Sequence, residues 1–317
     1  MKNILVTGGA GFIGSNLIDT LLNDLDVAIT CIDNFDFFYD PEIKKQNIKS
    51  HLGKSNFKLI TGDIRNIAEI KKELSGQYDS IIHLAAKVGV LPSLQDPMIY
   101  TEVNIVGTQN MLELAKEIGC KQFIFASSSS VYGVNPDVPW QEDQKALMPI
   151  SPYGATKISG ELLGQVYSHL YDFQFIGLRF FAVYGPRQRP DLAIHKFARL
   201  ILDEKPIPVY GDGKTKRDYT YVEDIVSGII ASLGYTSSQY EIINLGNNQP
   251  VDISELIVLL EKALGKKAII ENLPEKQGDV PITFADIKKA QKLLGYGPKT
   301  NLSIGLEKFV SWFKTQR

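Results

Sequence analysis

The sequence predicts an α/β protein: a doubly wound parallel sheet followed by a smaller C-terminal α/β lobe. Three observations predict this class. Short apolar runs rich in β-branched residues alternate with amphipathic segments through the first half of the chain. A glycine-rich turn, TGGAGFIG at residues 7–14, follows the first apolar run and opens the first helical pattern. The alternation loosens after about residue 181, where Pro, Gly and Arg become frequent.

Six apolar runs in the first part are expected to form strands. Each is apolar along nearly its whole length, as parallel strands are when helices cover both faces of a sheet. The runs are residues 3–8, 27–33, 57–63, 80–86, 122–128 and 174–180. Helical patterns fill the intervals at residues 12–23, 68–74, 103–119 and 153–171. Strand alternating with helix implies right-handed crossovers and therefore a parallel sheet.

The second part of the chain holds a strand-like run at 241–245 and helical patterns at 252–264 and 302–314. We expect it to contribute a lobe that packs over the carboxyl edge of the sheet, because ligands of open α/β sheets bind in the crevice at that edge. The expected sheet domain is residues 1–180 plus about 218–245, and the expected lobe is residues 181–217 plus 246–317.

Composition narrows the class of protein. The 317 residues are 44% hydrophobic and 22% charged, so the chain can bury a full core and is not disordered. A net charge of -2 gives no reason to expect nucleic acid as a partner. No apolar run reaches 18 residues, and the stretch before the first glycines is too short for a signal sequence, so a cytoplasmic protein is expected.

Cysteine and histidine usage predicts neither disulfides nor a metal centre. Cys31 and Cys120 both sit in apolar runs and are expected to be reduced core thiols. The four histidines show no ligand spacing, so no metal is expected; they are His51, His83, His169 and His195.

The glycine-rich turn predicts a dinucleotide site of the Rossmann type. Gly8 and Gly11 allow the backbone to turn and approach a pyrophosphate, and Gly14 allows the helix to pack closely on the sheet. Asp33 ends the second strand, where a carboxylate accepts from both hydroxyls of an adenosine ribose and repels a 2′-phosphate. NAD is therefore expected rather than NADP. The neighbouring residues expected to contact it are Phe12, Ile13 and Asn34.

Two further strand ends fit contacts with the cofactor. Asp63, followed by Ile64, ends the third strand, where it could lie near the adenine amino group. The fourth strand ends in Leu84, Ala85 and Ala86, whose small side chains would let the cofactor cross the backbone. His83, just before them, is expected to be a packed strand residue rather than a catalyst.

A second motif, SPYGATK at residues 151–157, predicts acid–base chemistry. Tyr153 and Lys157 lie one helical turn apart on the same face, and Pro152 suits a first helical turn. A free tyrosine, with a pKa of about 10, is a poor base at neutral pH. The Lys157 ammonium and a positive nicotinamide would lower that pKa. The pair could then take a proton from an alcohol while hydride leaves its carbon. Ser128, at a strand end 25 residues before Tyr153, is the third candidate.

These motifs resemble the extended short-chain dehydrogenase/reductase family, and within it the sugar-nucleotide 4-epimerases, especially the UDP-glucuronate 4-epimerases. The resemblance runs essentially end to end. Besides the glycine turn and Asp33, it is carried by SSSSVYG (127–133), YGATK (153–157), GLRFFAVYGPRQRPD (177–191), RDYTYVEDI (217–225), NLGNNQPV (244–251) and QGDV (277–280).

The resemblance implies that Ser128, Tyr153 and Lys157 form the catalytic triad. Ser128 would hold the sugar O4, Tyr153 would remove its proton, and Lys157 would bind the nicotinamide ribose. It also implies that Asn104 supports the active-site helix and that Phe181 contacts the nicotinamide end. A UDP-sugar substrate and a homodimer formed through helices 103–119 and 153–171 are implied as well.

The serine row separates the 4-epimerases from their relatives. Related 4,6-dehydratases carry Thr-Asp-Glu where this chain has Ser128, Ser129 and Ser130, and related decarboxylases keep a Glu at the Ser130 position. Hydroxyls cannot replace these acids, so the chemistry left is hydride removal from C4 and its return to the other face. The reaction expected is UDP-glucuronate to UDP-galacturonate by way of a 4-keto sugar.

A uronate substrate needs a partner for its carboxylate. Arg189 is the candidate, since a guanidinium grips a carboxylate at two points, with Ser129 and Ser130 as supporting donors. Arg189 could instead pair with Asp191 or bind a phosphate. Similar glucuronate epimerases often carry Arg where this chain has Leu91. A basic group near the substrate is therefore lost, unless Lys87 compensates for it. The UDP-glucose/UDP-galactose pair therefore stays as the alternative substrate.

The resemblance also implies residues that bind the UDP part of the substrate. Arg217 matches a family arginine on the diphosphate, and Asp279 matches a residue near the uridine ribose. Lys196 and Arg199 could equally be solvated charges on a helix. The rival functions are a UDP-sugar decarboxylase or dehydratase, a sugar ketoreductase and a non-catalytic NAD-binding protein.

Overall fold

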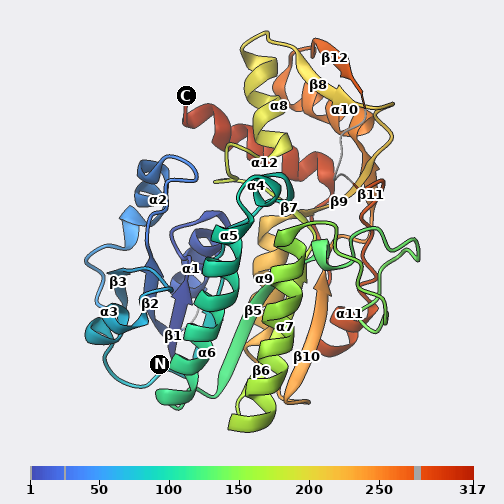
Figure 1. The fold of residues 1–317 in the computed structure, drawn as a ribbon. Helices are drawn as coiled ribbons and strands as arrows, with labels where there is room; N and C mark the ends of the chain where they lie inside the picture. Colours follow the sequence, from blue (N-terminus) through green and yellow to red (C-terminus); the bar gives the residue numbers. More distant parts are fainter. Residues whose placement is uncertain (1, 25, 275–279) are drawn as a thin grey trace.

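The structure, a computed structural model, describes residues 2–24, 26–274 and 280–317 (Figure 1). Its centre is a seven-stranded sheet in the order β10-β6-β5-β4-β1-β2-β3. Every neighbouring pair in this sheet is parallel. The strands are β1 (Lys2–Thr7), β2 (Val27–Asp33), β3 (Phe57–Thr61), β4 (Ser80–His83), β5 (Gln122–Ser128), β6 (Gln174–Phe180) and β10 (Tyr240–Leu245). The predicted doubly wound parallel sheet is confirmed.

Helices cover both faces of this sheet, which explains why the strands are continuously apolar. In β1, Ile4 and Val6 face one buried cluster while Leu5 faces the other. The first cluster includes α1 (Phe12–Asp24) and α9 (Val222–Ser232). The second includes α6 (Gly107–Glu117) and α7 (Pro152–Tyr171), with α3 (Ile67–Glu73) at the sheet edge. The remaining helices on this part of the chain are α2 (Pro41–Ile48), α4 (Val90–Gln95) and α5 (Pro97–Tyr100).

Smaller elements form the lobe above the carboxyl edge of the sheet (Figure 1). One three-stranded sheet has the order β11-β9-β7, and a two-stranded sheet pairs β12 with β8. The strands are β7 (Ala182–Tyr184), β8 (Ile207–Tyr210), β9 (Lys216–Tyr221), β11 (Pro250–Asp252) and β12 (Ile270–Leu273). The helices of the lobe are α8 (Ala193–Leu202), α10 (Ile253–Leu264) and α12 (Leu302–Thr315). The remaining helix, α11 (Lys288–Leu294), packs against β10 and α9 instead (Figure 1).

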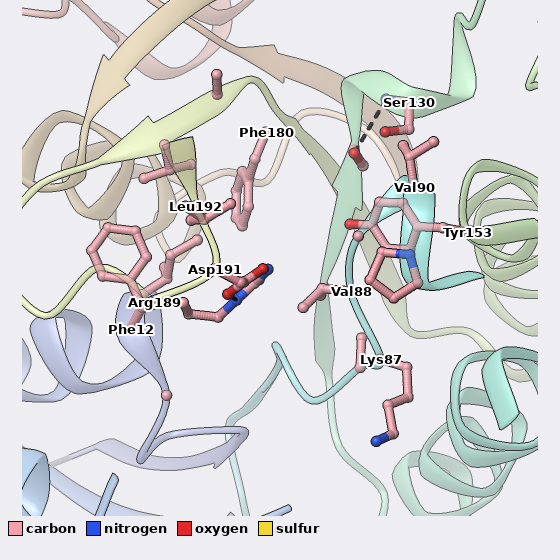
Figure 2. A pocket seen from close by; sticks show the side chains of 18 of the residues that line it. Phe12, Lys87, Val88, Val90, Ser130, Tyr153, Phe180, Arg189, Asp191 and Leu192 are labelled. Carbon is pink, nitrogen blue, oxygen red and sulfur yellow. Dashed lines mark hydrogen bonds and ion pairs between the residues drawn. The ribbon is translucent and has the colours of Figure 1, made fainter. Parts of the chain in front are cut away.

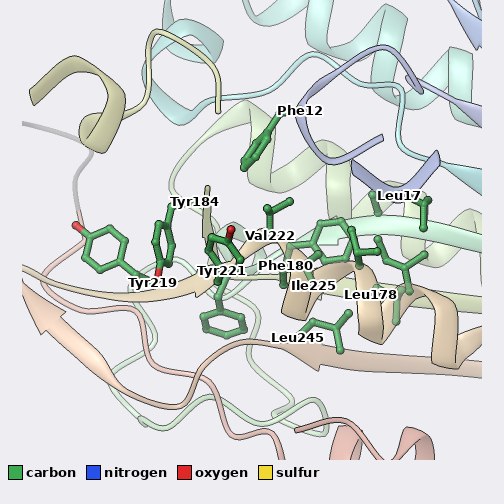
Figure 3. Close-up of a cluster of buried hydrophobic side chains, with 14 of the residues drawn as sticks. Phe12, Leu17, Leu178, Phe180, Tyr184, Tyr219, Tyr221, Val222, Ile225 and Leu245 are labelled. Carbon is green, nitrogen blue, oxygen red and sulfur yellow. The ribbon is translucent and has the colours of Figure 1, made fainter. Parts of the chain in front are cut away.

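The lobe shares a core with the sheet. Tyr184 and Tyr221, from the three-stranded sheet, are 1% exposed and pack beside Val222 and Ile225 of α9 (Figure 3). The same cluster continues to Leu178 on β6. The carboxyl ends of the strands and the lobe are therefore held against each other by buried apolar contacts.

Some elements differ from the predicted ones, and β3, expected over 57–63, already ends at Thr61. Residues 84–86 were expected to extend the fourth strand, but β4 stops at His83. Its partner β1 stops at Thr7, where the chain turns into the glycine loop, so the pairing of the two strands ends there. Beyond His83, Leu84 N donates a hydrogen bond to Thr7 O (3.1 Å) and Ala85 N donates one to Thr7 Oγ1 (3.2 Å). The helix expected at 103–119 begins earlier, with a π-helical turn over Thr101–Val106.

Within the described residues, no helix is long and apolar enough to span a bilayer. Cys31 and Cys120 are buried and free, as expected for core thiols.

Candidate active site

A cavity of about 880 Å³ lies between the carboxyl edge of the seven-stranded sheet and the lobe. It brings together almost every residue that the sequence singled out. Those residues are Gly8, Gly11, Phe12, Ile13, Gly14, Asp33, Asn34, Asp63, Ile64, Leu84, Ala85, Ala86, Ser128, Ser129, Ser130, Tyr153, Lys157, Phe181, Arg189 and Arg217. Two are exceptions: Asn104 lies behind the cavity wall, and Asp279 falls outside the described residues.

The glycine turn was expected to need three of its glycines, Gly8, Gly11 and Gly14, and two of these have no room for a side chain. Gly8 has φ +70°, and a Cβ there would lie 2.7 Å from Ala85 N. A Cβ on Gly14 would lie 2.3 Å from Gly8 O. We expected Gly14 to let the helix pack on the sheet, but it lets the helix pack on the turn itself. A Cβ on Gly11 would meet only Gly8 O, at 3.2 Å. The backbone at Gly11 thus stays open for a close approach by a phosphate, at the N-terminus of α1.

Asp33 is held in place beside this turn. Its Oδ2 accepts from Ala10 N at 3.0 Å and its Oδ1 from Phe35 N at 2.9 Å. Burial raises the pKa of the carboxyl, and these two hydrogen bonds lower it. Each oxygen keeps further acceptor capacity, as ribose hydroxyls require. The turn, the open Gly11 and this carboxylate fit a dinucleotide without a 2′-phosphate.

The third strand end supplies a carboxylate that is already engaged. Asn34 Nδ2 donates to Asp63 Oδ2 at 3.1 Å, and the Arg65 guanidinium binds both oxygens of Asp63. The hydrogen bonds with Arg65 lower the pKa of Asp63 to about 2. Asp63 is therefore ionised throughout the neutral range.

The reacting centre forms where β5 meets the first turn of α7. Ser151 caps this helix, since Gly154 N donates to its Oγ at 3.1 Å. The cap fixes the start of the helix, and Tyr153 and Lys157, four residues apart, share one face of it. The Tyr153 phenol lies close enough to Ser128 for the serine hydroxyl to lower its pKa. Lys157 Nζ donates to Ala126 O at 2.7 Å and lies 5.8 Å from the Tyr153 ring centre. The structure thus brings the three candidates of the triad together.

The serine row is shaped by its own backbone. Ser128 Oγ also accepts from Ser130 N at 3.1 Å (Figure 2). This bond turns the chain into a short 3₁₀ segment, Ser129–Val131, directly after β5. Ser127 points the other way and donates to Glu161 in the core. All four serines line the cavity, but the hydroxyl of Ser127 is engaged by Glu161.

The electrostatics of the centre differ from the simple expectation. Burial raises the pKa of Tyr153, and the Ser128 hydrogen bond and the Arg189 charge lower it. Burial also lowers the pKa of Lys157 to about 7, against the opposing charge of Glu161. Arg189 is thus a cation that lowers the pKa of the phenol from across the cavity. Burial outweighs the groups that lower it, so the pKa of Tyr153 in the protein alone lies above its usual value, whereas a pKa below that value was expected with NAD bound.

Arg189 lies across the cavity from Tyr153, in the loop after β7 (Figure 2). Its Nε and Nη2 donate to the two carboxylate oxygens of Asp191 at 2.9 and 2.7 Å. Its guanidinium carbon lies 5.5 Å from the ring centre of Phe38. The alternative of a pair with Asp191 is thus realised, in a position that still faces the cavity.

Lys87 does not replace the missing arginine at Leu91. Its Nζ donates to Asp36 Oδ1 at 2.8 Å, and its side chain points away from Tyr153 (Figure 2). Leu91 itself lines the cavity and is 36% exposed. The wall beside Tyr153 is completed by apolar residues, among them Val88 and Val90.

Asn104 supports the site from behind. It sits in the π-helical turn, where its Oδ1 accepts from Lys87 N at 2.8 Å. Its Nδ2 donates to Lys87 O at 2.9 Å and to Thr156 Oγ1 at 3.0 Å. One amide therefore joins the segment after β4 to the helix of Tyr153.

Comparison with known proteins agrees with this geometry. Residues 5–309 match the family described as GDP-mannose 4,6 dehydratase. The chain belongs to this family. It is 44% identical to a UDP-glucuronate 4-epimerase of Thermodesulfobacterium geofontis, with 99% of this chain and 97% of the relative covered. The predicted membership of the short-chain dehydrogenase/reductase class is confirmed.

Two solved structures of this family are similar to the chain along its length. The UDP-glucuronic acid 4-epimerase from Bacillus cereus, in complex with UDP-glucuronic acid and NAD, is 40% identical, with a TM-score of 0.92 and coverage of 99% and 100%. The UDP-N-acetylglucosamine 4-epimerase from Methanobrevibacter ruminantium M1 is 32% identical, with a TM-score of 0.89 and coverage of 100% and 99%.

Several residues that line the cavity of this chain were not predicted from the sequence. Lys44 lines it near Asp33, donates to Asp36 O at 2.6 Å and lies 4.6 Å from the Tyr39 ring centre. Phe38 and Tyr39 line it too. These residues belong to the stretch DNFDFFYDP (33–41) and its following helix, whose contacts depend on a loop path that the sequence does not show. His83, in contrast, is packed as expected, between Thr7 Oγ1 (2.7 Å) and Thr108 Oγ1 (3.1 Å).

Proposed function

We propose that the chain is an NAD-dependent isomerase that inverts C4 of a UDP-sugar, with UDP-glucuronate and UDP-galacturonate as the favoured pair. One observation carries this proposal. Ser128, Tyr153 and Lys157 meet at a cavity whose serine row holds hydroxyls where dehydratases and decarboxylases hold acids. The comparisons support it, because the relatives of similar length bear the name UDP-glucuronate 4-epimerase.

Each residue of the triad would have its own role in the reaction. Ser128 would hold the sugar O4, and Tyr153 would take the O4 proton and later return it. Lys157 would hold the nicotinamide ribose. Bound NAD would supply the chemistry by taking the C4 hydride and returning it to the opposite face. The cradle for NAD would consist of the glycine turn with Asp33, the strand ends with Asp63, and Phe181.

The carboxylate of a uronate requires a separate grip. A 4-keto uronate is a β-keto acid and loses CO₂ when the bond from C5 to the carboxylate aligns with the carbonyl π system. Arg189 would hold the carboxylate out of that alignment, assisted by Ser129 and Ser130. Its existing pair with Asp191 leaves Nη1 for this contact, unless the substrate displaces Asp191. UDP-glucose/UDP-galactose stays the alternative pair, since Leu91 and Lys87 add no cation beside Tyr153.

The UDP half would be held by the lobe, residues 181–217 plus 246–317. Arg217 and Lys196 of the lobe line the cavity. Asp279 remains the candidate for binding the uridine ribose. The sheet domain, residues 1–180 plus about 218–245, would hold NAD. The membership of β10 in the seven-stranded sheet supports this division.

We also propose a homodimer and a cytoplasmic location. Apolar side chains on α7 face outwards: Leu162, Val166 and Leu170 are 51–59% exposed. Val106, just before α6, is 48% exposed. A second copy would cover this stripe. The two free buried thiols suit a reducing compartment. Sedimentation of the purified chain and of a Leu162→Glu/Val166→Glu variant tests the dimer.

Turnover without added cofactor tests the reaction. The purified enzyme is incubated separately with UDP-glucuronate, UDP-glucose and UDP-xylose, and proton NMR identifies the C4 epimer and any loss of CO₂. Steady epimerisation by retained NAD is expected, and Tyr153→Phe should slow it by about 10²–10⁴-fold. A strict need for stoichiometric NAD(P)H would make the enzyme a ketoreductase. No turnover of any UDP-sugar, with NAD still bound, would indicate a non-catalytic protein.

A further inference from the structure

A buried ion pair lies directly behind the serine row. Arg179, on β6, donates from Nε and Nη2 to the two carboxylate oxygens of Glu161, on α7, at 2.9 and 2.7 Å. Both side chains are only 4% exposed. Burying both charges carries a large desolvation cost, which a packed apolar pair would avoid. Stability alone is therefore a weak explanation for the pair.

The other contacts of the pair lead to the reacting centre. Ser127, the residue before Ser128, donates to Glu161 Oε1. On the far side, Arg179 Nη1 donates to Tyr132 Oη at 2.8 Å, and Tyr132 donates to Asn244 Oδ1 at 2.8 Å. The carboxylate thus ties the end of β5, which carries Ser128, to the helix that carries Tyr153 and Lys157.

Glu161 also lies one helical turn beyond Lys157 on the same face of α7. Three titratable groups act on or lie near Lys157: Tyr153 and Glu161 from α7, and His83 from β4. The charge of Arg179, from β6, lies on the other side of Glu161, with which it is paired. His83 is neutral, because burial and the Lys157 charge lower its pKa to about 3. Glu161 is the charge that opposes the effect of burial on the pKa of Lys157.

We propose that Glu161 is a positioning residue for the reaction: it fixes Ser128 through Ser127, and it supplies the negative charge that Lys157 needs to remain a cation in the core. The two roles are separable. The hydrogen bond from Ser127 acts on geometry, whereas the charge acts on Lys157 through space. The charge role does not depend on the proposed function, and only the kinetic part of the test rests on it.

The charge role is tested by titrating Lys157 in the full chain. Protein carrying ¹⁵Nζ-lysine is followed by NMR against pH, with Lys157→Arg used to assign the signal. Glu161→Gln/Arg179→Gln removes both charges, so no unpaired ion is left in the core. We expect the midpoint of Lys157 to fall by about one pH unit or more. Tyr132→Phe, which removes hydrogen bonds of the same network but neither charge, should leave the midpoint within a few tenths. An unchanged midpoint in the folded double variant would overturn the charge role.

The geometric role is tested kinetically with Ser127→Ala. This variant removes one partner of Glu161 and leaves both charges in place. We expect kcat for the UDP-sugar to fall about tenfold with a small change in KM, while the Lys157 midpoint stays at its wild-type value. Wild-type kcat would overturn the geometric role. The titration needs no substrate, so its result stands even if the proposed epimerisation fails.

Should the double variant not fold, Glu161→Asp serves in its place. It keeps the negative charge but shortens the side chain. Lower kcat with the Lys157 midpoint kept near wild type is expected, and wild-type kcat would count against Glu161 as a positioning residue.

Discussion

Arg189 and Asp191 form a two-point ion pair in the wall of the cavity, across from Tyr153 (Figure 2). The side chain of Arg189 is 16% exposed and that of Asp191 is 39% exposed. The Asp191 carboxylate thus already accepts two hydrogen bonds from the Arg189 guanidinium, which a substrate carboxylate would also bind at two points. Selectivity between a uronate and a neutral sugar should depend on this competition.

Removing the competitor should favour the uronate. In Asp191→Asn the guanidinium loses its anionic partner, so the ratio of kcat/KM for UDP-glucuronate to that for UDP-glucose should rise about tenfold. In Arg189→Gln the same ratio should fall by a similar factor. The two substrates are compared by proton NMR under identical salt. If the ratio stayed constant in Arg189→Gln, Arg189 would not be the carboxylate partner.

An acid in the serine row should open a second reaction. Ser130 lines the cavity, and its backbone is held by Ser128. Ser130→Glu places a carboxyl group where decarboxylases carry one, so release of CO₂ from UDP-glucuronate should accompany epimerisation. Labelled CO₂ and the pentose product are measured, with Ser130→Ala as the neutral control. An unchanged product profile in Ser130→Glu would contradict the role given to the neutral serines.

A methyl group at Gly154 should disturb the serine row. A Cβ there would lie 2.5 Å from Ser130 O, a backbone atom that cannot move alone. Gly154→Ala should lower the free energy of unfolding by about 1–3 kcal/mol and reduce kcat, although alanine is the better helix former. Gly297→Ala is the control, because nothing lies within 4 Å of its Cβ position. Urea denaturation compares the two; equal stability of both variants would show that the contact relaxes freely.

His83 should make the protein less stable in acid. Its pKa is lowered to about 3 by burial, whereas an unfolded histidine titrates at about 6.5. Between these values the unfolded chain binds the extra proton, so stability is lost as the pH falls through this window. The difference in unfolding free energy between wild type and His83→Gln should therefore shrink by about 1.4 kcal/mol per pH unit below 6.5.

Denaturation at pH 7, 6, 5 and 4 measures this difference. Asp218, whose pKa is raised to about 6 by burial, has the opposite dependence but is common to both proteins and cancels. A difference that stayed constant over this range would show that His83 takes up a proton in the folded state.

Much of the fold and the site follows from local rules. The continuous apolar runs predicted buried parallel strands, and the structure has them within a few residues. The glycine turn and Asp33 come together because a strand, a tight turn and a helix have nearly invariant geometry. Tyr153 and Lys157 share a face because they are four residues apart on a helix. Such relationships depend on spacing along the chain, which the sequence states directly.

Other features were decided only by the tertiary structure. Lys87 was considered as a possible substrate contact, but it pairs with Asp36, 51 residues away. Glu161 of α7, which no motif singled out, meets Arg179 of β6 and Ser127 of β5. The pKa directions of Tyr153 and Lys157 follow from burial. The sequence alone determined which groups are present and how they are spaced on their own elements; partners and desolvation depend on how distant elements pack, and packing decided them.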